Sequence, residues 1–197
     1  MIIGLTGGIG SGKSVAGKFF EMHKTSVIDA DVLAKQALDK NSLGFSQAID
    51  FFGSSILDSE GHIDRVKLRA LVFSDPEKKS KLESIVHPIV RDLIHTSITN
   101  ATSPYSIIMV PLIFETNSMS AYNRILVIDC DSTLQLERAT LRDNNSSEQI
   151  QKILDSQCTR AERLSIANDV IPNNDSLDDL RTRSLTMHKF YLGLTQK

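Results

Sequence analysis

The residues best suited to chemistry, by type and spacing, lie in a glycine-rich segment near the N-terminus. Residues 7–14 read GGIGSGKS and match the pattern G-x-x-x-x-G-K-[ST] at every specified position. Glycines let the backbone wrap a chain of phosphates, and the loop N–H groups then point at anionic oxygens. In such a loop Lys13 reaches the β- and γ-phosphates, and the Ser14 hydroxyl ligates Mg²⁺. The candidate nucleotide-binding residues are Gly10, Ser11, Gly12, Lys13, Ser14 and Val15.

The flanks of this segment agree with a phosphate loop. The apolar run Ile2–Leu5 precedes it, and a helical pattern with Ala16, Phe19 and Phe20 on one side follows it. The alternative is a glycine-rich turn between a strand and a helix that carries an exposed lysine. Because every position and both flanks are present, we favour the phosphate loop.

A phosphate loop indicates a nucleotide and leaves the reaction open. A GTPase would carry a guanine-reading N-K-x-D segment and a transporter ATPase an L-S-G-G-Q segment, and the sequence contains neither. Residues 58–61, DSEG, fit D-x-x-G, but this pattern is common by chance. A chain of 197 residues with a helical insertion after its second strand favours a small-molecule kinase.

Two carboxylates follow the apolar residues Val27-Ile28. Asp29 lies at the carboxyl end of this predicted strand, and Asp31 enters the next helix. Sheets of α/β proteins bind ligands on that side, where a carboxylate could orient an acceptor hydroxyl and take its proton. The alternative is that Asp31 caps a helix over Val32–Leu38.

Two arginines, Arg138 and Arg142, are four residues apart and project from one helix face. Residues 143–147, DNNSS, follow as a polar loop. Arginines beside a mobile loop suit a lid that closes over a transferring phosphate, and the alternative is a solvated basic face. Arg160 and Arg163 are ambiguous between a lid and an ordinary helix surface.

Three further residues carry weaker signals. His87 precedes Pro88, and a histidine at a proline kink is more often a packed or capping group than a catalyst. Cys130 and Cys158 are isolated, without C-x-x-C spacing. This argues against a metal site or a disulfide scaffold and suits a reducing cytoplasm.

Short apolar runs alternate with longer helical patterns, which predicts β-α-β crossovers and a parallel sheet buried on both faces. The predicted strands are Ile2–Leu5, Ser26–Ile28, Ser106–Leu112, Ile125–Asp129 and Asp169–Ile171. Residues 29–105 are too many for one crossover, so we expect a helical insertion there. Pro88 should bend or break the long helical pattern within it.

Capping signals mark the expected helix starts. Capping-box spacing occurs at Ser132–Gln135, Ser146–Gln149 and Thr159–Glu162. The last two boxes predict that two helices meet near Gln157. Residues 74–77, SDPE, combine a cap, an early proline and an acidic first turn, and a last helix is expected after Ser176.

The composition is that of an ordinary globular protein with one domain and an insertion. Lys plus Arg number 22 against 24 Asp plus Glu, a formal charge of −2, so the basic excess usual in a nucleic-acid binder is missing. No apolar run reaches the length of ~20 residues that a membrane span needs. The N-terminus lacks the pattern of a secretory signal, which favours a cytoplasmic protein.

The motifs, taken in order, resemble one family, the dephospho-coenzyme A kinases. The matching blocks are residues 5–14 (LTGGIGSGKS), residues 27–31 (VIDAD) with Ala34, His87-Pro88, residues 110–115 (VPLIFE), and a closing block of Gln157, Arg160, Ala167 and residues 169–173 (DVIPN). Many families share the phosphate loop, whereas this ordered set spans nearly the whole chain and is highly specific.

The resemblance implies ATP-dependent phosphorylation of the ribose 3′-hydroxyl of dephospho-coenzyme A, the last step of coenzyme A biosynthesis, with Mg²⁺ accompanying ATP. It also implies a P-loop NTPase-type α/β fold of three layers, with a five-stranded parallel sheet of order 2-3-1-4-5. The expected organisation is one kinase domain over residues 1–197, a helical substrate-binding insertion over residues 32–100 and a lid over residues 138–160. The implied partners are ATP and dephospho-coenzyme A, with no nucleic acid, membrane or obligate protein partner.

By position, Asp31 resembles the family's catalytic carboxylate and Arg138 its lid arginine, while Lys13 holds phosphates. The substrate-binding candidates are Asp29, His87, Leu112, Glu115 and Arg160. Val15 stands where members often have threonine, so we expect weaker ATP binding. Lys35 replaces a common arginine and loses its bidentate fork, which bears on substrate affinity rather than on the reaction.

Two other functions stay open at this point. The chain could be a nucleotide-dependent switch that has lost phosphoryl transfer, although Asp31 and Arg138 favour an enzyme. It could also be a kinase of another small hydroxylated substrate. ATP consumption with and without dephospho-coenzyme A discriminates these alternatives.

Overall fold

The structure, a computed structural model, describes residues 1–196 and divides into two compact units. The first, here called the sheet unit, contains Met1–Ile28 and Ala101–Lys197, and the second, here called the helical unit, contains Asp29–Asn100. Each unit has its own cluster of buried apolar side chains. Among residues 1–196, no helix combines the length and the apolar character needed to cross a bilayer.

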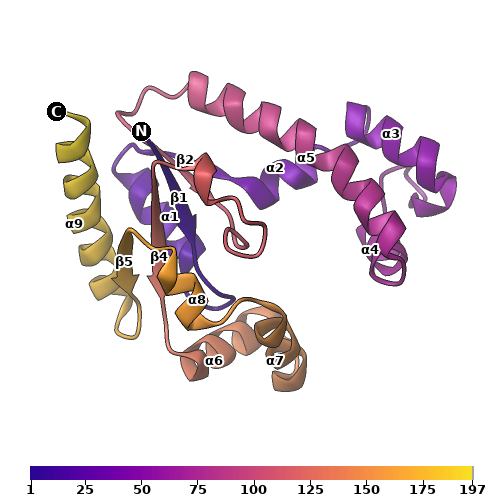
Figure 1. The fold of residues 1–197 in the computed structure, drawn as a ribbon. Coiled ribbons are helices and arrows are strands. Elements are labelled where there is room, and N and C mark those ends of the chain that lie inside the picture. The colour runs from indigo at the N-terminus through magenta and orange to yellow at the C-terminus, as the bar shows by residue number, and fades with distance from the viewer. Residues whose placement is uncertain (197) are drawn as a thin grey trace. The chain divides into compact units, whose positions relative to one another are not determined.

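Five strands form one sheet in the order β2-β3-β1-β4-β5 (Figure 1). They are β1 (Ile2–Thr6), β2 (Ser26–Asp29), β3 (Ser106–Met109), β4 (Arg124–Asp129) and β5 (Asp169–Pro172). The pairs β1 with β3, β1 with β4 and β4 with β5 are parallel, so helices must carry the chain between strands. The predicted parallel α/β fold and its strand order are confirmed.

The third strand is shorter than the predicted Ser106–Leu112, because β3 ends at Met109. Pro111 has no N–H to donate to a sheet ladder. Its carbonyl instead accepts a hydrogen bond from Thr6 Oγ1 at 3.1 Å. The chain therefore turns after β3, and Leu112 is partly exposed in that turn.

The sheet is covered on both faces, because alternate residues of β4 belong to different apolar clusters. Leu126 and Ile128 pack with side chains of α1 and α9, whereas Ile125 and Val127 pack with residues that include Leu164 of α8. The helices of the sheet unit are α1 (Lys13–Met22), α6 (Ser132–Asp143), α7 (Ser147–Ser156), α8 (Arg160–Ser165) and α9 (Leu177–Thr195), with a 3₁₀ turn η2 (Met119–Ala121). This arrangement gives the three layers that the sequence predicted.

Two of the three predicted capping boxes between residues 132 and 162 form. Ser146 caps α7 and Thr159 caps α8, each with the reciprocal bond to its third helical residue. The predicted meeting of two helices near Gln157 is thereby confirmed. The predicted capping box at Ser132 is wrong, because Asp131 is the N-cap of α6. The Asp131 side chain makes no cap bond, since its carboxylate accepts from Arg160 and Asn174 instead.

The helical unit packs around Ala48, Ile56 and Leu68. Its elements are α2 (Ala30–Gln36), α3 (Leu43–Phe52), a 3₁₀ turn η1 (Ser54–Ile56), α4 (Arg65–Phe73) and α5 (Pro76–Thr99). Asp75 caps α5 and Pro76 is its first residue, as the SDPE signal predicted. Pro88 does not break α5, because the helix is 24 residues long and continues on both sides of this proline.

Candidate active site

The glycine-rich segment joins the end of β1 to the start of α1, as the pattern predicted. Gly10 has φ +73° and Gly12 has φ +91°, a left-handed conformation that residues with a Cβ adopt at a cost. Ser11 N–H donates to the Gly8 carbonyl at 3.0 Å, which closes the turn. The Ser14 side chain is exposed in the first turn of α1, where a hydroxyl can serve as a ligand for a metal ion that arrives with phosphates.

Three residues distant in sequence hold this loop. Asn173 Nδ2 donates to the Ser11 carbonyl at 2.7 Å, and Gln157 Oε1 accepts the Ile9 N–H at 3.0 Å. Gln135 of α6 is buried against the loop, since a methyl group built on Gly10 would lie 2.2 Å from its carbonyl oxygen. The loop is therefore fixed from both α6 and the segment after β5.

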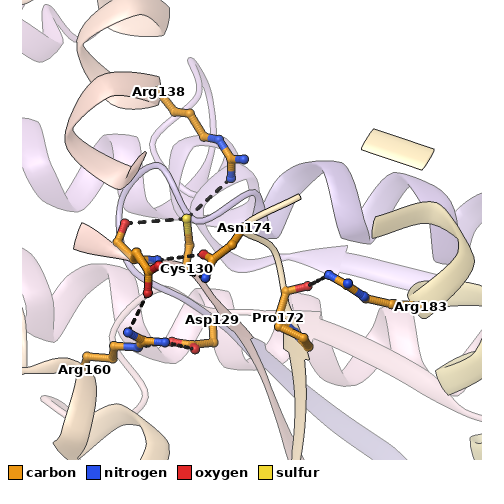
Figure 2. A network of polar contacts seen from close by, with 8 residues as sticks. Asp129, Cys130, Arg138, Arg160, Pro172, Asn174 and Arg183 are labelled. Atoms are coloured by element: carbon orange, nitrogen blue, oxygen red, sulfur yellow. Dashed lines mark hydrogen bonds and ion pairs between the residues drawn. The ribbon is translucent and has the colours of Figure 1, made fainter. Parts of the chain in front are cut away.

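The two arginines of α6 have different surroundings. Arg138 Nη1 donates to the Asn173 carbonyl at 2.8 Å. It also donates to Cys130 Sγ at 3.4 Å (Figure 2). It lines a cavity of about 210 Å³ together with Gly12, Val15, Asn173, Asp175, Leu177 and Leu180. Arg142 instead donates from Nε and Nη2 to the two carboxylate oxygens of Asp143, each at 2.7 Å, and is largely exposed. Of the pair, Arg138 is the arginine beside the phosphate loop.

Arg160 is held by two carboxylates at the end of β4. Its guanidinium donates to Asp129 at 2.8 and 2.6 Å and to Asp131 at 2.7 Å (Figure 2). Asn174 Nδ2 donates to the other oxygen of Asp131 at 2.9 Å. Hydrogen bonding to Asp129 raises the pKa of Arg160, so the side chain stays charged and anchors α8 to the sheet.

The thiol of Cys130 belongs to the same network. Burial raises the pKa of this thiol, so its sulfur stays protonated near neutral pH. It can then donate to the Asp131 carbonyl at 3.7 Å while it accepts from Arg138. Cys130 and Cys158 are both free cysteines, and residues 1–196 hold no cluster of three His, Cys, Asp or Glu side chains suited to a metal.

The turn after β3 also contacts the segment between α7 and α8. Glu115 Oε1 accepts the Cys158 N–H at 2.8 Å. This contact places Glu115 beside Gln157, the residue that holds the phosphate loop. Leu112 lies in the same turn with 38% of its surface exposed.

The acidic pair belongs to the helical unit and resolves one alternative. Asp29 is the N-cap of α2, and its Oδ1 accepts the N–H groups of Asp31 at 2.9 Å and Val32 at 3.3 Å. The interpretation of Asp31 as the cap is therefore wrong, because the helix begins at Ala30, one residue before it. Asp31 lies in the first helical turn, and its surface is exposed.

His87 lies in the middle of α5 with its surface exposed. It is therefore neither packed in a core nor at a helix end. The structure leaves a substrate-binding role open for it and removes the capping alternative.

Sequence reasoning gave no structural role to the residues that support the loop. Gln135, Gln157 and Asn173 contact it across 125 or more residues of chain, and no spacing rule reaches that far. Gln157 and Asn173 entered only through the family resemblance. Arg163, which the sequence left ambiguous, is 7% exposed and lies near Gly8.

The close approach of Gln135 to the loop generates a stability prediction. Gly10→Ala should lower the free energy of unfolding by about 2 to 5 kcal/mol, since it adds strain at positive φ and a contact with a backbone oxygen. Gly193→Ala is the matched control, because Gly193 lies in α9 with open space around it and should raise stability by about 0.5 to 1 kcal/mol. Urea denaturation of the nucleotide-free variants measures both changes, and equal stabilities would contradict the loop geometry.

Comparison with known proteins matches this chain to one family. A family model described as dephospho-CoA kinase matches residues 1–179. A dephospho-CoA kinase of Gamma-proteobacterium EBAC31A08 is 52% identical over 194 residues, which are 98% of this chain and 98% of the relative. Among solved structures, TT1252 from Thermus thermophilus has a TM-score of 0.88 at 31% identity over 98% of this chain and 97% of its own. A dephospho-CoA kinase from Campylobacter jejuni has a TM-score of 0.69 at 29% identity over 95% of each chain. The chain therefore belongs to the dephospho-CoA kinase family.

Proposed function

We propose that the protein transfers the γ-phosphoryl group of ATP to the ribose 3′-hydroxyl of dephospho-coenzyme A, giving coenzyme A and ADP. The observation that carries this proposal is the complete phosphate loop, held in its left-handed turns at Gly10 and Gly12, in a chain of this kinase family. Phosphoryl transfer depends mostly on positioning and on charge stabilisation, which such a loop provides.

Lys13 and Ser14 are the proposed phosphate and metal contacts of the loop. Lys13 begins α1, and its proposed role is to screen charge on the β- and γ-phosphates with its ammonium. The exposed hydroxyl of Ser14 fits one position in the coordination of Mg²⁺, and nucleotide phosphates and water supply the other positions. When bound, Mg²⁺ neutralises charge on the bridging phosphate oxygens.

Asp31 is the proposed acceptor of the proton that the ribose hydroxyl loses. Its carboxylate is not used as a helix cap, because Asp29 fills that position. An exposed carboxylate can accept a hydrogen bond from a substrate hydroxyl.

Residues 32–100, which lie within the helical unit, are the proposed substrate-binding insertion, and residues 138–160 are the proposed lid. Residues 29–100 bury a core of their own, which suits a part that binds substrate as a separate body. The proposed substrate contacts are Asp29, His87, Leu112, Glu115 and Arg160. The free cysteines support a reducing cytoplasm as the location.

The product of the reaction tests the proposed function directly. Incubation with ATP, Mg²⁺ and dephospho-coenzyme A should yield a product heavier by one phosphoryl group, located at the 3′ position by fragmentation in mass spectrometry. Adenosine should be a much poorer acceptor, because remote binding energy helps to orient the reacting hydroxyl. ATP hydrolysis without a phosphorylated product would indicate a nucleotide switch, and equal kcat/KM for adenosine would indicate a general nucleoside kinase.

The role of Asp31 is separable from helix capping. Asp31→Asn keeps the shape of the side chain and removes its basicity, so kcat should fall by about 10² or more while the melting temperature stays nearly constant. Asp29→Ala is the control for capping and should lower the free energy of unfolding by about 1 kcal/mol. Steady-state turnover and thermal unfolding measure the two effects. An Asp31→Asn variant with wild-type kcat would remove Asp31 from the mechanism.

Arg138 is the proposed lid arginine over the phosphates. Its planar guanidinium can keep the Asn173 carbonyl and still present other N–H groups to an anion, which an ammonium does less well. Arg138→Lys should lower kcat by about 10² to 10³ and weaken ATP binding less. Arg142→Lys is the matched variant four residues away and should be milder. ATP titration beside turnover measures both variants, and a larger loss at Arg142 would reverse the assignment.

A further inference from the structure

Arg163 of α8 is a buried cation without a counter-ion. It is 7% exposed. The only hydrogen bond that its guanidinium makes to residues 1–196 runs from Nη2 to the Cys158 carbonyl at 2.9 Å, and no carboxylate of these residues lies within ion-pair distance of it. Arg124, Arg160 and Arg183 each pair with an aspartate. A buried guanidinium with one neutral acceptor carries a large desolvation cost, so a missing anion is indicated.

The position of the Arg163 guanidinium beside the phosphate loop indicates which kind of anion it binds. A methyl group built on Gly8 of the phosphate loop would lie 3.3 Å from Arg163 Nη1, so the guanidinium stands against the loop where Gly8 has no side chain. Arg163 also lines a cavity of about 630 Å³ with Gln135, Gln157 and other residues of α6, α7 and α8. The backbone at this end of the loop is held by Gln157 through the Ile9 N–H.

The carboxylates of the same cavity are already engaged. Asp131 accepts from Arg160 and Asn174, and Asp155 accepts from Gln151 Nε2 at 2.8 Å. Neither carboxylate lies within ion-pair distance of Arg163 in the described residues. The anion must come from outside the protein, and the adjacent loop has the sequence and turns of a phosphate-binding segment.

The end of the loop that Arg163 contacts indicates which phosphate it meets. The loop's later residues and the N-terminus of α1 cradle the α- and β-phosphates, whereas Gly8 and Ile9 lie at the strand end of the loop. We propose that Arg163 binds the terminal, γ-phosphate of ATP, with the Cys158 carbonyl orienting its guanidinium. This rests on the proposed use of ATP as phosphoryl donor.

The preference for ATP over ADP tests this proposal, because a purely structural role of Arg163 would leave that preference unchanged. In Arg163→Met the unbranched stem stays and the charge is lost. Binding of Mg²⁺–ATP, measured by calorimetry without acceptor, should weaken by about tenfold or more, while the affinity for Mg²⁺–ADP changes less than about threefold. Arg163→Lys should restore part of the preference for ATP, because it keeps the charge without the fork.

The control is Arg181→Met, which removes an exposed arginine of α9 and should leave both affinities unchanged. Thermal unfolding of nucleotide-free Arg163→Met should match or exceed that of the wild type, because an uncompensated buried charge is removed. Equal losses for ATP and ADP, or unchanged preference for ATP with a lower melting temperature, would overturn the proposal. A preference of the wild type for ATP that is lost in Arg163→Met, together with no formation of coenzyme A, would support this inference and remove the proposed acceptor. Product formation with unchanged nucleotide preference in Arg163→Met would remove this inference alone.

Discussion

One buried asparagine connects the phosphate loop to the ends of the strands. Asn173 Nδ2 donates to the Ser11 carbonyl, its N–H donates to the Asp129 carbonyl at 2.7 Å, and its own carbonyl accepts from Arg138. The residue is 6% exposed, so these bonds are shielded from water, and losing one would leave a buried polar group unpaired. The loop, β4 and α6 are therefore fixed relative to one another by a single side chain and its peptide groups.

This connection requires glycine in the loop. A methyl group on Gly12 would lie 2.3 Å from Asn173 Nδ2, and one on Gly10 would lie 2.2 Å from the Gln135 carbonyl oxygen. The small residues thus serve two purposes, since they allow positive φ and also let α6 and the segment after β5 approach the loop. The parallel register of β1, β4 and β5 brings their carboxyl ends to one edge of the sheet, where ligands of α/β proteins bind.

Local rules predicted the parts of this protein that are set locally. The phosphate loop and the caps at Ser146 and Thr159 depend on residues at most eight positions apart, and each formed as expected. The strand order came from the family resemblance. The expected cap at Ser132 failed because a neighbouring residue that the pattern did not rank took its place. Asp131 replaced Ser132 as the cap of α6, and its carboxylate was bound by Arg160 rather than by the helix.

The two arginines of α8 show why spacing alone could not assign the site. Arg160 and Arg163 are three residues apart, so sequence gives them the same helix face and the same charge. Arg160 is half exposed and donates to the carboxylates of Asp129 and Asp131. The effect of these bonds is geometric, because they hold α8 against the end of β4. With α8 held there, Arg163 stays buried beside Gly8. Arg160, whose charge is neutralised by two aspartates, thereby positions Arg163, whose charge is not neutralised.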